Sequence, residues 1–423
     1  MSGDTRLERQ LPLILADLGA GPAPDYTETL LARTAATAQR PGWTFIEWWL
    51  PMSALTERMA TTPRVPLRAL AAVAILILAL VAAALYVGSQ QRRLPAPFGP
   101  AGNGLIAYSS GGDILVGDPV TGDPRLLVGG PAEDSGPGFS PDGTRLAFFR
   151  ESDLSGPRDI YVVNEDGSHL VRVTPEPVPQ QAWANWAPDG RMAVIQSGSA
   201  GMNQFDLYDT TGNGSVQMVA SAAGMDFVQF RPPDGREFLY RALVDGKWGL
   251  FAMNVDGSTM RTIVEPTVDA KIDMTYSRVT WSADGSRIFY NRGAADGCCQ
   301  LWVVNADGSD PHEFVPPGVD SWIGEAVVSP DGTWVAYWHS PNDGQTFGLS
   351  VVRADGTGPV IETGPEQPGG AHWTWAPDSS KILMYPDDVS SSYAYLLDPE
   401  GGPWTRVPWQ SGGDLDWQRV AAD

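Results

Sequence analysis

Residues 139–148 read Phe-Ser-Pro-Asp-Gly-Thr-Arg-Leu-Ala-Phe, a tight-turn sequence between two apolar runs. Asp142 can bond its own backbone and Gly143 tolerates a positive φ, so this stretch predicts a hairpin turn. Related turns recur along the chain, with aspartates at positions 142, 189, 234, 284, 331 and 378. Their successive spacings are 47, 45, 50, 47 and 47 residues. A second Asp-Gly turn lies within several of these units, as at Asp166–Gly167 and Asp307–Gly308.

Each unit also contains short apolar, β-branched and aromatic runs, which are typical of β-strands. About four strands per unit and a period of roughly 40 to 50 residues predict the blades of a β-propeller. Six complete first-strand motifs occur but seven second-strand motifs, the earliest at Asp113–Val116. Residues 414–419 carry a matching Trp417 and can supply the missing first strand. We therefore predict a mainly β, seven-bladed propeller over residues 105–420, closed by the C-terminal strand, with six blades as the alternative.

The repeated units resemble the WD40-like propeller repeats of the TolB C-terminal domain and of the dipeptidyl peptidase propeller. The resemblance covers residues 105–420 and rests on motifs such as Trp186–Gly190 and Trp281–Gly285. It implies the fold but not the function, because propellers host many unrelated activities.

An apolar stretch divides the chain ahead of the propeller. Residues Ala69–Val87 form 19 positions without a charge, which as a helix would span nearly the thickness of a bilayer core. We expect a transmembrane helix at 68–88, a cytosolic helical region at 1–67 and a Pro/Gly linker at 89–104. Residues 1–93 carry a net charge of +2 and residues 94–423 a net charge of −24. The acidic body favours a single-pass protein with a cytosolic N-terminus and an extracytoplasmic propeller.

The overall net charge of −22 argues against nucleic-acid binding, which needs a basic surface. A short helical cytosolic piece, one membrane crossing and a large exterior domain resemble the layout of a membrane-bound anti-sigma factor. That resemblance implies a sigma factor as a cytosolic partner. The zinc motif of such proteins needs His and Cys, and residues 1–67 contain neither.

An aromatic cluster precedes the apolar stretch and consists of Trp43, Phe45, Trp48 and Trp49. It is a candidate for partner binding or for the membrane interface. Packing against the two preceding predicted helices is the alternative.

The chemistry-bearing residues do not form a recognisable catalytic motif. The sequence has no Gly-x-Ser-x-Gly nucleophile elbow, and its four histidines are scattered over different units. The Asp-Gly turns do not follow the spacing of a calcium loop. We therefore expect no enzyme activity, no metal and no cofactor.

Two further features are candidates for a site. Counting three residues back from the first position of each repeat predicts a ring at the funnel mouth, formed by Gly136, Trp183, Phe227, Arg278, Glu325, His372 and Asp414. Such a ring could hold a polar ligand or a peptide. The adjacent Cys298 and Cys299 are a candidate vicinal disulfide, or else a free thiol pair.

Together these features predict a non-enzymatic, membrane-anchored propeller that binds a ligand or protein partner outside the cell membrane. Its tail would signal as an anti-sigma-like regulator. One alternative is an envelope scaffold of the TolB type, and the other is an extracytoplasmic propeller hydrolase or lyase.

Overall fold

The computed structural model describes residues 71–81, 94–151, 156–198, 201–266, 279–293, 299–314, 321–341, 346–368, 371–386, 393–410 and 415–422. Residues 1–90 and 91–423 form separate compact units. Residues 71–81 are helical, and the described part of the chain holds no helix long and apolar enough to cross a membrane. The rest of the expected span at 68–88 and the helices expected within 1–67 lie outside the described residues.

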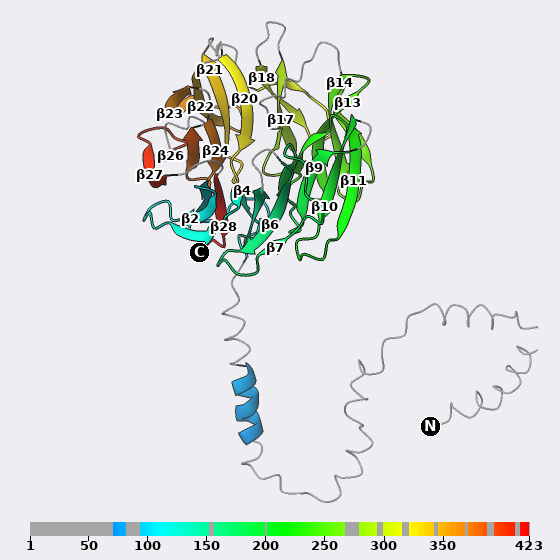
Figure 1. Cartoon of the computed structure of the whole chain (residues 1–423). Helices are drawn as coiled ribbons and strands as arrows, with labels where there is room; N and C mark the ends of the chain where they lie inside the picture. Colours follow the sequence, from blue (N-terminus) through cyan, green and yellow to red (C-terminus); the bar gives the residue numbers. More distant parts are fainter. Residues whose placement is uncertain are drawn as a thin grey trace, which may run out of the picture. The chain divides into compact units, whose positions relative to one another are not determined.

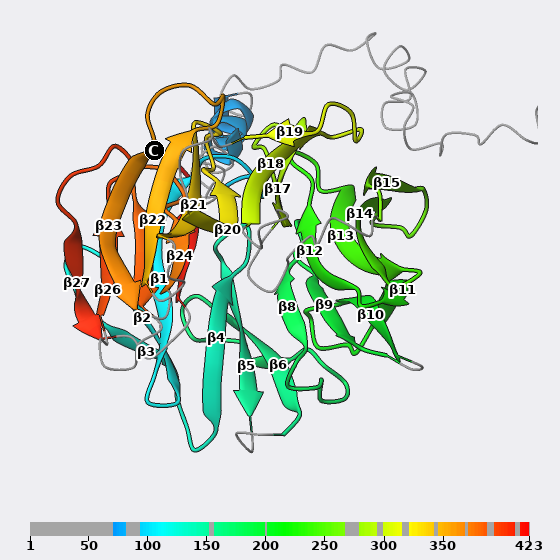
Figure 2. The ribbon, with the colours of Figure 1, turned by 90° about the horizontal axis from the view of Figure 1, so that it is seen from above.

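Seven four-stranded antiparallel sheets form the second unit, as the sequence predicts, and they lie around a ring (Figure 1 and Figure 2). Numbered from the N-terminus, blade 1 has β28 (Leu415–Val420), β1 (Gly102–Ser110), β2 (Asp113–Gly117) and β3 (Arg125–Val128). Blade 2 has β4 (Glu133–Phe139), β5 (Arg145–Glu151), β6 (Arg158–Asn164) and β7 (Val171–Arg172). Blade 3 has β8 (Trp183–Trp186), β9 (Met192–Ser197), β10 (Met202–Tyr208) and β11 (Val216–Ala223).

The remaining four blades follow the same order. Blade 4 has β12 (Asp226–Phe230), β13 (Glu237–Val244), β14 (Lys247–Asn254) and β15 (Met260–Val264). Blade 5 has β16 (Thr280–Trp281), β17 (Arg287–Gly293), β18 (Cys299–Asn305) and β19 (His312–Glu313). Blade 6 has β20 (Ser321–Val328), β21 (Trp334–Pro341), β22 (Thr346–Arg353) and β23 (Ile361–Pro368). Blade 7 has β24 (Ala371–Trp375), β25 (Ile382–Pro386), β26 (Tyr393–Leu397) and β27 (Thr405–Gln410).

Blade 1 joins the two ends of the propeller. The C-terminal strand β28 pairs with β1 in antiparallel register, with Ile106 opposite Trp417 and Tyr108 opposite Leu415. This pairing closes the ring and removes the edges that an open arc of sheets would expose. The predicted closure by the C-terminal strand is therefore confirmed, and the six-bladed alternative is not.

The repeated turn joins the first and second strands of blades 2 to 7 through a local network. Asp142 Oδ1 accepts hydrogen bonds from Ser140 Oγ at 2.6 Å and from the Thr144 amide at 3.1 Å. Gly143 has a φ of +69°, and a Cβ at this position would lie 1.9 Å from the Arg419 carbonyl oxygen. The glycine is thus required both by the backbone conformation and by the close approach of β28.

The apolar core consists of clusters lying between neighbouring blades, and the motif tryptophans contact the preceding blade. Trp186 Nε1 donates to the Gly138 carbonyl at 2.8 Å, and Trp375 Nε1 donates to the Val327 carbonyl at 3.1 Å. Because each acceptor is on the first strand of the preceding blade, the first strands form the inner ring. We call β4, β8, β12, β16, β20, β24 and β28 the inner strands.

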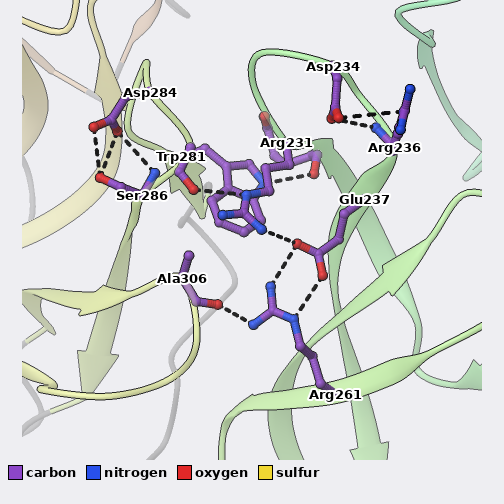
Figure 3. A network of polar contacts seen from close by, with 11 residues as sticks. Arg231, Asp234, Arg236, Glu237, Arg261, Trp281, Asp284, Ser286 and Ala306 are labelled. Atoms are coloured by element: carbon purple, nitrogen blue, oxygen red, sulfur yellow. Dashed lines mark hydrogen bonds and ion pairs between the residues drawn. The ribbon is translucent and has the colours of Figure 1, made fainter.

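Ion pairs within blade 4 hold two arginines that also contact blade 5, as Figure 3 shows. Glu237 lies between two arginines and accepts from Arg231 at 2.9 Å and from Arg261 at 2.7 Å. Arg231 also donates to the Gly285 carbonyl at 2.9 Å, and its guanidinium lies 5.0 Å from the Trp281 ring. The carboxylate of Glu237 thus holds in place an arginine that joins blade 4 to blade 5.

Candidate functional site

The central ring has two chemically different ends. We call the end with the repeated Pro-Asp-Gly turns the turn end, and the end where the inner strands begin the start end. Of the predicted ring, Trp183 begins β8, and Phe227 and His372 are the second residues of β12 and β24, whereas Gly136 and Glu325 lie in the middle of β4 and β20. Arg278 and Asp414 lie outside the described residues, as do Cys298 and the aromatic cluster formed by Trp43, Phe45, Trp48 and Trp49. Cys299 is the first residue of β18.

The described members of the predicted ring have different surroundings. Trp183, the first residue of β8, is 37% exposed. His372 on β24 is exposed and stacks on Tyr385, with ring centroids 5.2 Å apart. Glu325 is half-buried. Phe227 is half-buried and packs against the apolar cluster between blades 4 and 5 rather than standing free in the funnel.

A backbone irregularity repeats on the inner strands of blades 2, 4 and 6. The pairing shifts between Ser135 and Gly138 on β4, and equivalent shifts occur on β12 and β20. In each bulge the residue three places before the repeat's first position has a positive φ. These residues are Gly136 (+60°), Phe227 (+26°) and Glu325 (+38°). Bulges of this kind bend a strand and re-aim its side chains, and they are common beside functional sites.

Two Asp–Arg pairs stand next to these bulges. Asp134 on β4 is fully buried through its side chain and accepts two hydrogen bonds from Arg150 on β5, both 2.7 Å long. These bonds raise the pKa of Arg150 above its usual value. Asp226 on β12 makes the same two-point contact with Arg241 on β13. Two-point contacts of this kind hold the arginine guanidinium and the aspartate carboxylate in fixed positions at the rim of the start end.

The turn end is crossed by a segment that the sequence indicated only as a linker. Residues 94–101, which we call the strap, precede β1. Phe98 packs on the apolar cluster of blades 3 and 4. Arg419 Nη2 donates to the carbonyl oxygens of Ala96 at 3.1 Å and Gly99 at 2.6 Å. The Ala101 amide donates to the Pro377 carbonyl in blade 7 at 2.9 Å. The strap therefore runs from one side of the ring to the other.

A buried polar cluster between blades 5 and 6 was not predicted from the sequence. Asn291 is fully buried and donates to the Ile323 carbonyl at 2.7 Å. His339 is 9% exposed and lies 2.9 Å from Ser350 Oγ through its Nδ1. Burial raises the pKa of Tyr337 to about 12. Within the described residues, no group of three or more His, Cys, Asp or Glu side chains is placed to hold a metal ion.

Comparison with known proteins supports the fold and goes no further. Protein-family profiles give no match to this sequence, and curated protein sequences give none either. Among solved structures, a prolyl endopeptidase matches with a TM-score of 0.54 and 13% identity, over 74% of this chain and 51% of that chain. An oligogalacturonate lyase in complex with manganese matches with a TM-score of 0.52 and 12% identity, over 73% of this chain and 84% of that chain. TolB from Acinetobacter baumannii matches with a TM-score of 0.49 and 16% identity, over 74% of this chain and 81% of that chain.

Proposed function

We propose that this protein is a non-enzymatic binding propeller that receives a protein or peptide partner at the start end, outside the cell membrane. In this proposal residues 68–88 anchor the propeller, and residues 1–67 transmit the binding event to a cytosolic sigma factor. The apolar stretch Ala69–Val87 and the acidic charge of the following residues support this arrangement.

The backbone strain on the inner strands is the observation that carries the proposal. A residue other than glycine held at positive φ costs of order 1–3 kcal/mol, and both Phe227 and Glu325 are held there. Ring packing alone does not require this conformation, since β8 pairs with β9 and β24 with β25 without a register shift. Strain that recurs on the inner strands, which surround the centre of the ring, supports a role for this central surface in binding.

The chemistry of the start end suits a polar peptide surface with an aromatic anchor. Trp183 offers an exposed indole, His372 an exposed imidazole and Glu325 a carboxylate. Aromatic side chains near the centre of an interface commonly carry most of its binding energy. The strap crosses the opposite end of the ring, so the start end is the approach to the channel that we propose for the partner.

Affinity capture of the full chain from its own membranes tests the proposal. We expect a partner that co-purifies with the wild type and is lost from the Trp183→Ala/His372→Ala variant. The control is Met218→Ala, because Met218 is 65% exposed on the outer strand β11. Equal recovery of the partner with the variant and the wild type would contradict binding at the start end.

A deletion of residues 1–60 separates signalling from an envelope scaffold. A scaffold would keep its exterior partner and its cellular function after the deletion. A regulator would keep the partner but lose both the sigma factor and the response. Absence of a sigma factor from the wild-type complex would eliminate the anti-sigma version.

A further inference from the structure

The turn end contains a groove that is partly walled by the protein's own strap and keeps a volume of about 140 Å³. Pro97 and Phe98 line this space together with residues of three consecutive blades, which are Pro141, Asn185, Trp186, Pro188, Val228, Gln229 and Phe230. We call it the occupied groove, because strap residues take up part of it. Prolines and aromatic rings form much of its lining, and the strap reads Leu-Pro-Ala-Pro-Phe-Gly-Pro from residue 94 to residue 100.

A second groove lies on the other side of the turn end. It encloses a volume of about 220 Å³ and is lined by three consecutive blades, 6, 7 and 1. Its walls are Val327, Val328, Pro330, Trp373, Thr374, Trp375, Pro377, Asp416, Trp417 and Arg419. We call it the vacant groove. A cavity of about 150 Å³ can take a benzene-sized ring, so this groove has room for an aromatic side chain.

The two grooves are built from the same positions of the repeat. The first position of the motif supplies Trp186 and Phe230 to the occupied groove, and Trp375 and Trp417 to the vacant one. The position before it supplies Asn185 and Gln229 to the former, and Thr374 and Asp416 to the latter. The motif prolines are Pro141 and Pro188 on one side, and Pro330 and Pro377 on the other. The internal symmetry of the propeller therefore presents one kind of groove twice.

Arg419 adds a specific contact for an extended backbone. It occupies the place of the motif proline in β28 and donates from Nη2 to two strap carbonyls. Its Nε is buried and has no hydrogen-bond partner among the described residues. The same side chain lines the vacant groove, beside the carboxylate of Asp416. A guanidinium that already binds peptide carbonyls borders the space in which a second peptide would lie.

We infer that the vacant groove binds an extended, proline-containing peptide segment of another protein, with an aromatic side chain seated between Trp375 and Trp417. Extended proline-rich segments lose little conformational entropy on binding, and aromatic-lined grooves are their usual receptors. The occupant class follows from the strap, because a segment of that composition packs against the equivalent groove. This site is centred on Trp375 and Trp417, whereas the proposed partner site uses Trp183 and His372, so variants at different residues test the two sites.

Calorimetric titration of the full chain with a synthetic peptide of the strap sequence tests the inference. The peptide LPAPFGP should bind the wild type with one peptide per chain. The peptide LPAPAGP, which lacks the aromatic ring, should bind at least about tenfold more weakly. Phe98→Ala removes the strap's own ring from the occupied groove, and we expect it to raise the stoichiometry to two peptides per chain.

Filling the vacant groove should abolish binding. Thr374→Phe places a ring in that groove and should remove the peptide site, and Thr405→Phe makes the same change at an exposed position on β27 and should leave it intact. If Thr374→Phe lowers the thermal midpoint, Val327→Phe fills the same space from blade 6. No binding of LPAPFGP, equal binding of LPAPAGP, or full binding to a folded groove-filling variant would each overturn the inference.

Discussion

Trp417 Nε1 donates a hydrogen bond to the Gly104 carbonyl at 3.2 Å, joining residues 313 positions apart in the chain. The contact lies inside blade 1, where β28 from the C-terminus pairs with β1 from the beginning of the propeller. The ring therefore depends on the last strand of the propeller in chain order, β28. The stability of the whole propeller therefore depends on the strand pairing in blade 1.

The closing tryptophan should be a major stabilising residue. Trp417 is 5% exposed, so Trp417→Ala leaves a large cavity and should cost about 3–5 kcal/mol. Trp404→Ala is the matched control, because Trp404 is 45% exposed in blade 7, and it should cost less than about 1 kcal/mol. Thermal unfolding of both variants measures the difference. Equal midpoints for the two variants would contradict the closure of the ring by β28.

Gly143, in the clearest copy of the repeated turn, should not tolerate an added methyl group. Gly143→Ala must adopt a positive φ and would bring its Cβ against the Arg419 carbonyl, so we expect a loss of more than about 2 kcal/mol. Gly111→Ala has a similar φ of +62° but no atom within 4 Å of its new Cβ, and should lose only about 1 kcal/mol. Urea unfolding compares the two. A smaller loss at Gly143 than at Gly111 would refute the close approach of β28.

Glu237, which lies between two arginines, should contribute more to the stability of the fold than an exposed ion pair does. The Glu237 side chain is 13% exposed, and its replacement by alanine leaves Arg231 and Arg261 without their shared carboxylate. We expect a loss of about 1–2 kcal/mol in the free energy of unfolding. Arg236→Ala removes an ion pair of 3.6 Å in which the arginine is 87% exposed, and should change stability by less than about 0.5 kcal/mol. Similar effects of the two changes would show that the network in Figure 3 does not stabilise the contact between blades.

The turn aspartates make stability fall in acid. The hydrogen bond from Ser282 Oγ lowers the pKa of Asp284 below its usual value, with further donation from Ser286. A depressed pKa in the folded state means that the unfolded chain binds a proton first, so the stabilisation is complete at neutral pH. It is lost as the pH falls below about 4 and through the folded-state pKa. Urea unfolding between pH 7 and pH 3 should show this loss, and Asp284→Asn should reduce its slope; an unchanged slope would contradict the role of the turn carboxylate.

The blade count and the closure could be predicted because they follow from repeated local chemistry. The Pro-Asp-Gly turn at Asp142 and its relatives mark the first hairpin of blades 2 to 7, and the additional Trp417 motif reveals where the missing strand comes from. The bulges could not be predicted in this way. Gly136, Phe227 and Glu325 share a positive φ but no side-chain chemistry, so no common local signal marks them in the sequence.

The packing of the strap could not be predicted from its composition. Proline and glycine between residues 94 and 104 correctly exclude a helix, but they do not indicate whether such a segment is free or packed. The seat of Phe98 depends on Trp186 and Phe230, which lie about 90 and 130 positions further along the chain. Contacts between residues that far apart in the sequence form only in the assembled ring. The positions of Trp183 and His372 near the beginning of their strands, by contrast, follow from the repeat alone.

Site-specific photo-cross-linking tests the central claim that the start end is the partner-binding surface. A photoreactive phenylalanine analogue placed at Trp183 or at His372 in the full chain should form a cross-link to the same exterior protein in living cells. The analogue placed at Val120, which is 83% exposed in blade 1, should form none. Cross-links from Val120 to that protein, or none from either start-end position, would contradict the account.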